Sequence, residues 1–436
     1  MQVEPFKAFR FNADVVGDVG GCIAPPYDVI DDAQREQLYA KSEHNLVRIT
    51  KGKTTAADSE RNNPYTRAAD YLSRWIKEGA LKQDSAEAIY GYVQDFELAG
   101  ARYRRHSFIA LGKLEEFGKI VKPHEQVFPK PMIDRLSLKR ATCADFGLVF
   151  MLYEDEQKIA DQIIAEAAER EPLIDFVDEQ DVRHRLFAIT AKKHIKQIAK
   201  MMSDKSCIIA DGHHRYTTGL TYSKESKDPA AKYQMLAFAN THQDGLIILA
   251  THRLVGNLEN FSMGKLIAGL GERFQITRYE FDSLKAKTRA REKMLEQMRA
   301  EHENDKNAFG IYGCGNAFYC AVLQDRDAMD RLVPERSGAW RALDVSILHK
   351  LILEQLLSID ERRLTRGENV EYVKDTANAI DDSIAQIDAG RKQAAFFMNP
   401  VKIQQLKMVT DAGERMPQKS TYFYPKVYSG LTINKL

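Results

Sequence analysis

The stretch CIIADGHHRYTTGL, residues 207–220, decides the fold. Its first four residues are apolar or small, as in a short buried strand, and the part from Arg215 onward suits a helix. Asp211 and Gly212 join the two, because glycine permits a tight turn and the close approach of a ligand. The residues before it suit a strand followed by a helix. We therefore predict the order β-α-β-turn-α over residues 185–224.

This turn has the chemistry of an anion site. Backbone N–H groups and the dipole at a helix N-terminus favour negative charge. Arg215 can form a forked pair with phosphate, and His213 and His214 can donate hydrogen bonds or shuttle a proton near neutral pH. Asp211 can bind a metal, orient a histidine or accept a proton, or it serves only as a helix cap. Adjacent histidines on a helix point roughly 100° apart, which disfavours a dedicated zinc site.

The composition is that of an ordinary globular protein. The 436 residues include 63 basic and 62 acidic side chains and are 44% hydrophobic, so generic nucleic-acid binding is disfavoured. The five cysteines are odd in number and form no Cys-x-x-Cys pair, which favours a reduced, cytoplasmic protein. The N-terminus does not resemble a signal peptide, and the apolar runs are too short to span a membrane. We expect no membrane partner, and a homodimer stays open.

Strands and helices alternate along most of the chain, which predicts a mixed α/β fold with several lobes. We expect a hairpin that turns at Ala99–Gly100, a strand over residues 45–50, a long functional loop over residues 121–146 and an apolar helix over residues 345–357. The predicted lobes are an N-terminal α/β lobe, a core that contains the Asp-Gly-His-His-Arg turn, and a C-terminal lobe with a docked tail, over residues 1–155, 156–270 and 271–436.

IADGHHR, after a β-α-β unit, resembles the signature of the ParB/sulfiredoxin superfamily, with Gly212 to Arg215 as the match to its Gly-x-x-Arg turn. The Asp-Gly-His-His-Arg version resembles the free-serine kinase branch, which phosphorylates the hydroxyl of serine. The resemblance implies a ParB/sulfiredoxin-like core around this turn. It also implies a nucleotide, ATP or ADP with CTP as an alternative, bound together with Mg²⁺. The implied cofactor-binding residues are Gly212, His213, His214, Arg215 and Thr217.

A second resemblance covers nearly the whole chain. Several motifs, in this order, are similar to those of a bacterial family, domain of unknown function 1015. The family name implies no activity. The motifs are APPYDVI, the His-Glu pair at 124–125, DRLSLKRAT, IADGHHRYTTG, THRLV and KSTYFYPKVYSGL.

Carboxylates in the 121–146 segment are candidates for catalysis. A kinase that acts on an alcohol needs a carboxylate to take or orient the hydroxyl proton, and cations to stabilise the transferring phosphoryl group. Glu125 and Asp134 are the candidates here, together with Asp211 and His213 from the turn. Asp211 and Glu125 are also the predicted Mg²⁺ ligands. The alternative is a solvated charged loop.

Further residues are candidates for substrate binding. Two lie in a proline-rich turn, one follows Asp134, two end an apolar strand, and two belong to the C-terminal tail. The alternatives are a structural turn, an ordinary strand end and an ordinary C-terminal strand. The candidates are Tyr27, Asp28, Arg135, His252, Arg253, Ser420 and Lys426.

The sequence therefore favours a nucleotide-dependent kinase that transfers a phosphoryl group to the hydroxyl of serine or a related metabolite. One alternative is a ParB-like, nucleotide-dependent DNA-binding protein, although no basic helix-turn-helix follows the turn. Another is a regulator that binds phosphate or nucleotide without catalysis. Sulfiredoxin chemistry is disfavoured because the turn contains no cysteine, and no Walker P-loop occurs.

Overall fold

A computed structural model describes residues 1–127 and 129–436 of the chain. These residues form two compact units, which we describe separately. Unit 1 comprises Met1–Ile247 and Pro425–Leu436, and unit 2 comprises Ile248–Tyr424. No helix among the described residues is long and apolar enough to cross a membrane.

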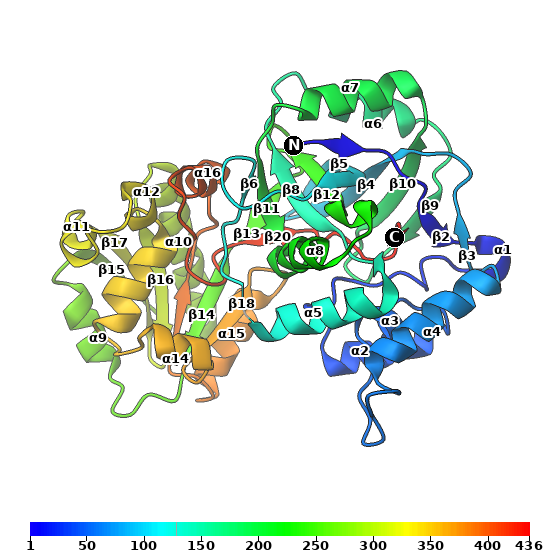
Figure 1. The fold of residues 1–436 in the computed structure, drawn as a ribbon. Coiled ribbons are helices and arrows are strands. Elements are labelled where there is room, and N and C mark those ends of the chain that lie inside the picture. Colours follow the sequence, from blue (N-terminus) through cyan, green and yellow to red (C-terminus); the bar gives the residue numbers. More distant parts are fainter. Residues whose placement is uncertain (128) are drawn as a thin grey trace. The chain divides into compact units, whose positions relative to one another are not determined.

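Unit 1 is built around one mixed sheet of nine strands, in the order β6-β11-β8-β12-β5-β4-β10-β9, with β1 on β5. Helices α6 and α7 cover one face of this sheet and α8 covers the other, with α5 packed on α8 (Figure 1). The strands of unit 1 are β1 Val3–Glu4, β2 Phe9–Phe11, β3 Leu81–Gln83, β4 Ile89–Leu98, β5 Ala101–Lys113, β6 Val121–Lys122, β7 Ala144–Asp145, β8 Val149–Tyr153, β9 Ile174–Val177, β10 Arg183–Ile189, β11 Cys207–Asp211, β12 Tyr233–Asn240 and β21 Asn434–Lys435. The helices are α1 Ala13–Val16, α2 Asp32–Lys41, α3 Val47–Thr50, α4 Pro64–Lys77, α5 Pro129–Thr142, α6 Ile159–Ala167, α7 Lys192–Met202, α8 His213–Glu225 and η1 Pro229–Lys232.

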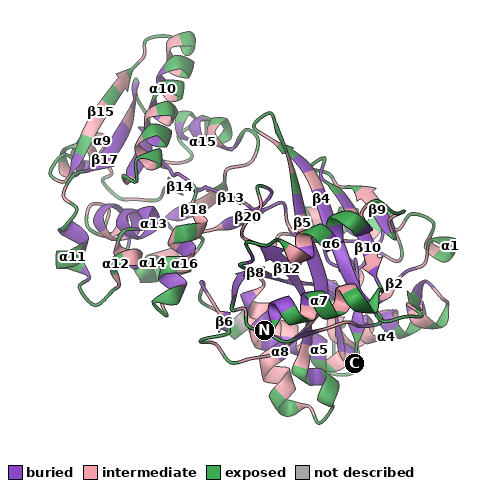
Figure 2. Ribbon diagram, turned by 90° about the horizontal axis from the view of Figure 1, so that it is seen from above, coloured by how far each residue is buried: buried purple, intermediate pink, exposed green. Residues whose placement is uncertain are grey.

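The apolar core of unit 1 lies between the sheet and helices α6 and α7. Phe108, Met151 and Phe238 come from the strands, and Ile164 and Met202 come from the two helices. Strands β8 and β12 are almost wholly buried, whereas the outer faces of α6 and α7 are exposed (Figure 2). This burial of apolar side chains holds both helices on the sheet and fixes where β11 ends.

The predicted order around the turn is confirmed. Strand β10, helix α7, strand β11 and helix α8 follow one another, and the Asp-Gly-His-His-Arg residues connect the last two. The predicted hairpin is also confirmed, because β4 and β5 pair on either side of Ala99 and Gly100, whose φ angles are 50° and 78°. Positive φ at both central residues is typical of a two-residue hairpin turn. The mixed α/β fold class is confirmed as well.

Two predictions of local structure are wrong. Residues 47–50 of the expected strand form helix α3, because the Asn45 side chain accepts a hydrogen bond from the Val47 N–H at 2.9 Å and starts a helical turn. The expected long loop contains the 14-residue helix α5. Its prolines at positions 129 and 131 indicated a loop, but proline is tolerated in the first turn of a helix.

Unit 2 is built on an antiparallel sheet of six strands, in the order β15-β17-β16-β19-β14-β18. The expected apolar helix begins as α13 and continues as a π-helix, η2. The strands are β13 Ile247–Leu249, which begins at the last residue of unit 1, β14 Thr251–Val255, β15 Phe274–Glu280, β16 Ala308–Gly313, β17 Ala317–Leu323, β18 Val370–Lys374, β19 Ala394–Phe397 and β20 Tyr422–Tyr424. The helices are α9 Met263–Leu270, α10 Leu284–Glu303, α11 Ala328–Leu332, α12 Gly338–Arg341, α13 Asp344–Ile347, η2 Leu348–Glu354, α14 Glu361–Arg366, α15 Ala379–Asp388 and α16 Ile403–Asp411.

The two units do not coincide with the three predicted lobes. Strand β5, from the predicted N-terminal lobe, pairs with β12 from the predicted core, so both segments contribute to one sheet. The last twelve residues of the chain belong to unit 1, where β21 pairs with β7.

Candidate functional site

The turn between β11 and α8 requires glycine for two reasons. Gly212 has a φ of 95°, in the left-handed region that other residues rarely adopt. A Cβ atom at this position would also lie 3.0 Å from Nε of Arg215. Gly212 therefore lets the arginine side chain fold back beside the first turn of the helix.

Three charged side chains meet at this turn and form what we call the charged cluster, Asp211, Arg215 and Lys426. The Lys426 ammonium donates to Asp211 Oδ2 at 2.9 Å, and Arg215 Nη2 donates to Oδ1 at 3.3 Å. None of the three side chains is more than 17% exposed. Burial alone would raise the pKa of the Asp211 carboxyl, but Lys426 and Arg215 outweigh it and hold this pKa well below its ordinary value.

The charge balance of this cluster suits an anion. Two cations face one carboxylate, which leaves one net positive charge beside the N-terminus of α8. The second Nη of Arg215 donates to the carbonyl of Leu148, so the guanidinium is held in place from two sides. A group with fixed orientation and little freedom to lose binds an anion at a smaller entropic cost.

A buried pair on the sheet positions the lysine of the charged cluster. Gln94 Nε2 donates to the carbonyl of Lys426 at 3.0 Å, and Arg105 Nη2 donates to the carbonyl of Pro425 at 2.6 Å. Arg105 also donates to Gln94 Oε1, from Nε at 3.0 Å, and both residues are fully buried. This pair was not predicted from the sequence. Gln94 gave one signal, as a polar residue inside the mostly buried strand β4, whereas Arg105 stands in the polar first half of β5.

The histidines next to the turn are held in defined tautomers. The backbone N–H of His124 donates to Nε2 of His213 at 3.2 Å, so this nitrogen carries a lone pair. Nδ1 of His124 lies 2.6 Å from the carbonyl of Ile209, which can only accept, so Nδ1 carries the proton. Burial lowers the pKa of His124. Nε2 of His213 is therefore engaged by the backbone, which disfavours its predicted catalytic role through that atom.

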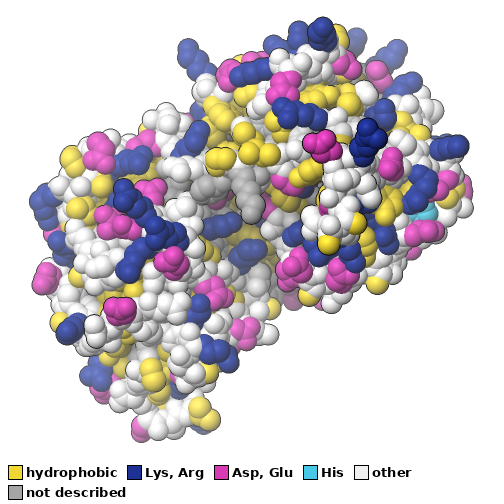
Figure 3. All heavy atoms as spheres, turned by 60° about the horizontal axis from the view of Figure 1, so that its bottom comes forward, with side chains coloured by type: hydrophobic (Ala, Val, Ile, Leu, Met, Phe, Trp, Pro, Cys, Tyr) yellow, Lys and Arg dark blue, Asp and Glu magenta, His cyan; other side chains and the backbone are white. Residues whose placement is uncertain are grey.

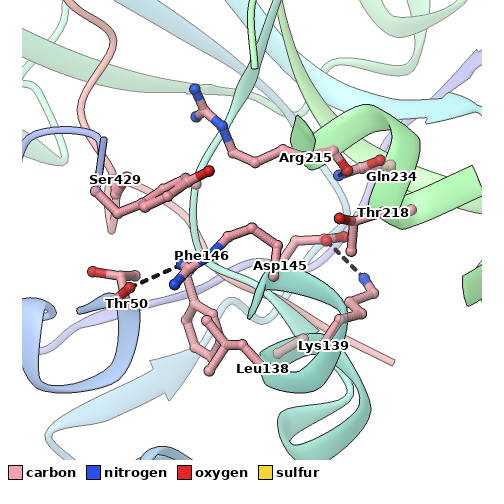
Figure 4. Close-up of a pocket in the computed structure, with 14 residues that line it drawn as sticks. Thr50, Leu138, Lys139, Asp145, Phe146, Arg215, Thr218, Gln234 and Ser429 are labelled. Carbon is pink, nitrogen blue, oxygen red and sulfur yellow. Dashed lines mark hydrogen bonds and ion pairs between the residues drawn. The ribbon is translucent and has the colours of Figure 1, made fainter. Parts of the chain in front are cut away.

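A cavity of about 50 Å³ brings together three of the predicted residues, Tyr27, Arg135 and Arg215. Cζ of Arg135 lies 3.9 Å from the centroid of the Tyr27 ring, and Nη1 donates to the carbonyl of Thr50 at 2.8 Å. Burial raises the pKa of Tyr27. Figure 4 shows the cavity between Arg215, Thr50 and Asp145.

The predicted carboxylates have different surroundings. Asp134 accepts from Nε of Arg135 at 2.8 Å and from the Tyr65 hydroxyl at 2.9 Å. Burial and this hydrogen bond raise the pKa of Tyr65 to about 12. Glu125 is half-buried and follows His124 directly, and Asp28 is exposed. Asp134 therefore orients Arg135 toward the cavity, and Glu125 is the carboxylate nearest in sequence to the buried histidine pair.

The remaining cofactor candidates lie on α8. His214 is half-buried, and the hydroxyl of Thr217 is buried without a hydrogen-bond partner among the described residues. Both stay predictions.

Three predicted substrate-binding residues belong to unit 2, whereas the charged cluster and the cavity are described from unit 1 alone. Nη2 of Arg253 donates to the carbonyl of Lys419 at 3.1 Å, and Nδ1 of His252 accepts from the N–H of Met398 at 3.1 Å. Ser420 donates to the carbonyl of Pro417. These three buried side chains connect strands and the tail of unit 2. The contacts support the alternative interpretations, an ordinary strand end for His252 and Arg253 and an ordinary C-terminal strand for Ser420.

The predicted metal ligands do not form a site made of protein atoms alone. Within residues 1–127 and 129–436, no group of three or more histidine, cysteine, aspartate or glutamate side chains is placed to hold a metal ion. Both oxygens of Asp211 already accept from cations, and a divalent ion there would be repelled by Lys426 and Arg215. This geometry disfavours Asp211 both as a metal ligand and, given its low pKa, as a proton acceptor.

Comparison with known proteins identifies a family. The family model described as "Protein of unknown function (DUF1015)" matches residues 3–346. No curated protein sequence matches the chain.

The chain is similar to several solved structures at low identity and low TM-score. A conserved hypothetical protein from Pyrococcus furiosus is 13% identical, with a TM-score of 0.32, over 70% of this chain and 88% of its own. A free serine kinase in complex with AMP is 12% identical, with a TM-score of 0.34, over 70% and 83%. SbnI with a C-terminal truncation, from Staphylococcus aureus, is 11% identical, with a TM-score of 0.35, over 75% and 87%.

Proposed function

Because the chain belongs to the DUF1015 family, whose name assigns no activity, we propose a function from the site itself. We propose that the protein is a nucleotide-dependent kinase that transfers a phosphoryl group to the hydroxyl of a small metabolite, serine or a related compound. The observation that carries this proposal is the charged cluster, in which Lys426 and Arg215 meet Asp211 at the start of α8.

The cluster supports phosphate binding in three ways. Gly212 lets an anion approach the first backbone N–H groups of α8, which have no partner within the helix. Lys426 and Arg215 supply the positive charge that a transferring phosphoryl group needs. Asp211 keeps both cations in place before a ligand arrives. In this proposal the nucleotide is ATP or ADP, with CTP as the alternative.

The proton acceptor in this proposal is Glu125. The pKa of Asp211 is too low for a base at neutral pH, and Asp134 already accepts from Arg135 and Tyr65. The hydroxyl oxygen of the substrate forms a bond to the terminal phosphorus of the nucleotide. The bond from that phosphorus to the bridging oxygen breaks, and the hydroxyl proton passes to Glu125. Mg²⁺, bound through the nucleotide phosphates, would neutralise their charge.

DNA binding is the weaker candidate. Basic and acidic side chains are mixed over the face of the molecule drawn in Figure 3, and the whole chain carries a net charge of +1. Electrostatic DNA binding favours a continuous basic stripe. A strong gel shift at moderate salt would reverse this preference.

Calorimetric titration with ATP, ADP, CTP and pyrophosphate, each with Mg²⁺, tests the proposal. Serine is then added, and mass spectrometry detects a phosphorylated product. We expect one nucleotide to bind and to yield phosphoserine, and we expect Glu125→Gln to bind that nucleotide but to lose the product. Binding by the wild type without any product, over a panel of small alcohols, would favour the regulator instead.

A further inference from the structure

The cavity beside Arg215 contains three buried acceptor atoms whose hydrogen-bonding capacity is unused. They are Asp145 Oδ2, Thr218 Oγ1 and Gln234 Oε1, and none has a hydrogen-bond partner among the described residues. The three residues are only 6%, 4% and 3% exposed. A buried polar atom left without a partner costs about 1–3 kcal/mol, so three such oxygens in one cavity are accounted for by bound water or by a donor-rich ligand.

The acceptors are held by specific contacts and are not surface side chains that happen to be near each other. Asp145 Oδ1 accepts from the Lys139 ammonium at 2.6 Å, which leaves Oδ2 for a ligand. Gln234 Nε2 donates to the carbonyl of Arg215 at 3.1 Å, which fixes Oε1 as the atom left over. A Cβ atom at Gly219 would lie 2.0 Å from that Oε1, so the glycine makes room for the Gln234 side chain.

Three cationic side chains also line the cavity. Arg135 and Arg215 line it together with the ring of Tyr27, and Lys139 lines it beside Asp145. Two of these cations also pair with carboxylates outside the cavity lining, Arg135 with Asp134 and Arg215 with Asp211, and their remaining N–H groups can donate to an anionic group of a ligand. Arg135 is fixed by the Thr50 carbonyl and the Asp134 carboxylate, so its guanidinium is oriented before a ligand arrives, and its remaining N–H groups can donate to a carboxylate.

The size of the cavity restricts the ligand. A volume of about 50 Å³ holds roughly four water-sized groups, which suits the charged groups of a small metabolite. Thr218, Gln234 and Asp145 lie on the α8 side of this space, across from Thr50 and Ser429 (Figure 4).

We propose that this cavity binds a small zwitterion of the amino-acid class. The ammonium group donates to Asp145, Thr218 and Gln234, and the carboxylate pairs with Arg135. Arg215 borders both this cavity and the charged cluster, so a ligand here lies next to the proposed phosphate site. That this zwitterion accepts the phosphoryl group rests on the proposed function. Its binding to the cavity does not, because it can be measured without a nucleotide.

Calorimetry on the full chain, with three probes that differ by one group each, tests the cavity. L-serine carries an ammonium and a carboxylate, L-glycerate has a hydroxyl in place of the ammonium at the same configuration, and ethanolamine lacks the carboxylate. We expect L-serine to bind about tenfold or more tightly than either of the others, the equivalent of one lost charged hydrogen bond.

Two matched variants test the assigned atoms. Thr218→Val keeps the shape of the side chain and removes the hydroxyl, and it should weaken L-serine binding about fivefold or more. Thr221→Val makes the same change on the same helix, where the hydroxyl already donates to the Thr217 carbonyl at 2.9 Å, and it should leave the affinity unchanged.

The outcomes separate this inference from the proposed function. L-serine binding that depends on Thr218, without phosphorylated product, would support the cavity and reject the kinase. Equal binding of L-serine and L-glycerate would overturn the ammonium assignment. If none of the three probes binds the wild type, the cavity holds only water, and the inference is wrong even if a nucleotide binds at the turn.

Discussion

Asp211 lies between two cations, and its ionised form holds them at the start of α8. Lys426 and Arg215 each donate to one of its oxygens, and together they keep the pKa of its carboxyl well below the ordinary value. The ionised carboxylate therefore stabilises the folded state wherever an unfolded aspartate would also be ionised. That stabilisation is lost as the pH falls below about 3.9, the ordinary pKa of aspartate, toward the lower value in the folded chain.

Asp211→Asn should therefore destabilise the protein at pH 7 and have a smaller effect at pH 3. Removing one partner from a fully buried ion pair costs about 3–5 kcal/mol. We expect a loss of about 2 kcal/mol in the free energy of unfolding here, because the side chains of the charged cluster are up to 17% exposed. Urea unfolding at the two pH values measures the difference. Asp70→Asn, on the exposed face of α4, is the control. A difference between wild type and Asp211→Asn that stays constant with pH would contradict the account.

Single residues of the candidate site differ in how well the sequence predicts them. Arg215, Arg135 and Tyr27 belong to separate motifs, and their residue types suggested a site before the fold was known. Thr218 and Gln234 gave no such signal, because a hydroxyl on a helix and an amide on a strand are ordinary residues until their neighbours are known. What distinguishes them is a buried side-chain oxygen that has no hydrogen-bond partner among the described residues, and this depends on contacts distant in sequence.

At the scale of elements, the C-terminal segment is the part of unit 1 whose placement matters most for the site. Strand β21 pairs with β7, the strand that carries Asp145, and the carbonyls of Pro425 and Lys426 accept from Arg105 and Gln94. Contacts of the C-terminal segment with β4 and β5 thus position Lys426 in the charged cluster, and its pairing with β7 positions Asp145 in the wall of the cavity. The sequence indicated a docked tail but not these contacts.

Arg105→Met should release the segment that positions Lys426. The methionine keeps much of the apolar stem but leaves the Pro425 carbonyl and Gln94 Oε1 without their donor, at a cost of about 1–3 kcal/mol each. We expect lower stability and at least tenfold weaker pyrophosphate binding, measured by thermal unfolding and calorimetry. Arg104→Met, on the same strand with a side chain 57% exposed, is the matched control. Destabilisation with unchanged pyrophosphate affinity would reject the positioning role.

Errors in element prediction came from local signals that tertiary structure overrides. The prolines of helix α5 suggested a loop, and the alternation over residues 45–50 suggested a strand, yet Leu46, Val47 and Ile49 are all buried. In a short helix that is buried on several sides, apolar residues do not recur every three to four positions, so the sequence pattern does not indicate a helix. The β10-α7-β11-α8 order was predictable because each of its elements has a clear apolar pattern.

At the scale of the whole molecule, the mixed α/β class and the family were predictable and the division into units was not. Lobe boundaries depend on which strands pair, and β5 joins β12 across more than a hundred residues. Unit 2 has its own apolar core and contains a buried aspartate with a raised pKa. Asp344 is buried there, and burial raises the pKa of its carboxyl to about 7 even though Asn307 donates to it at 2.6 Å.

This raised pKa predicts a pH dependence for unit 2. The folded chain keeps the proton of Asp344 up to about pH 7, whereas an unfolded aspartate loses it near pH 3.9. Stability therefore falls as the pH rises from about 4 to 7. Asp344→Asn keeps an oxygen that accepts from Asn307 but has no carboxyl to ionise, so it removes this loss. The gain in its free energy of unfolding over the wild type should therefore be larger at pH 8 than at pH 5, by up to about 3 kcal/mol. Urea unfolding measures this, with exposed Asp382→Asn as the control, and equal gains at both pH values would contradict it.

The central claim is that the turn between β11 and α8 binds nucleotide phosphate through the charged cluster. Calorimetric titration of the wild type, Arg215→Ala and Arg140→Ala with ATP and Mg²⁺ tests it most directly. Arg140 is an exposed arginine that pairs with Glu225 on α8, so its loss controls for general charge. The account predicts binding by the wild type and Arg140→Ala, and none by a folded Arg215→Ala protein. Unchanged ATP affinity in Arg215→Ala would contradict the phosphate site.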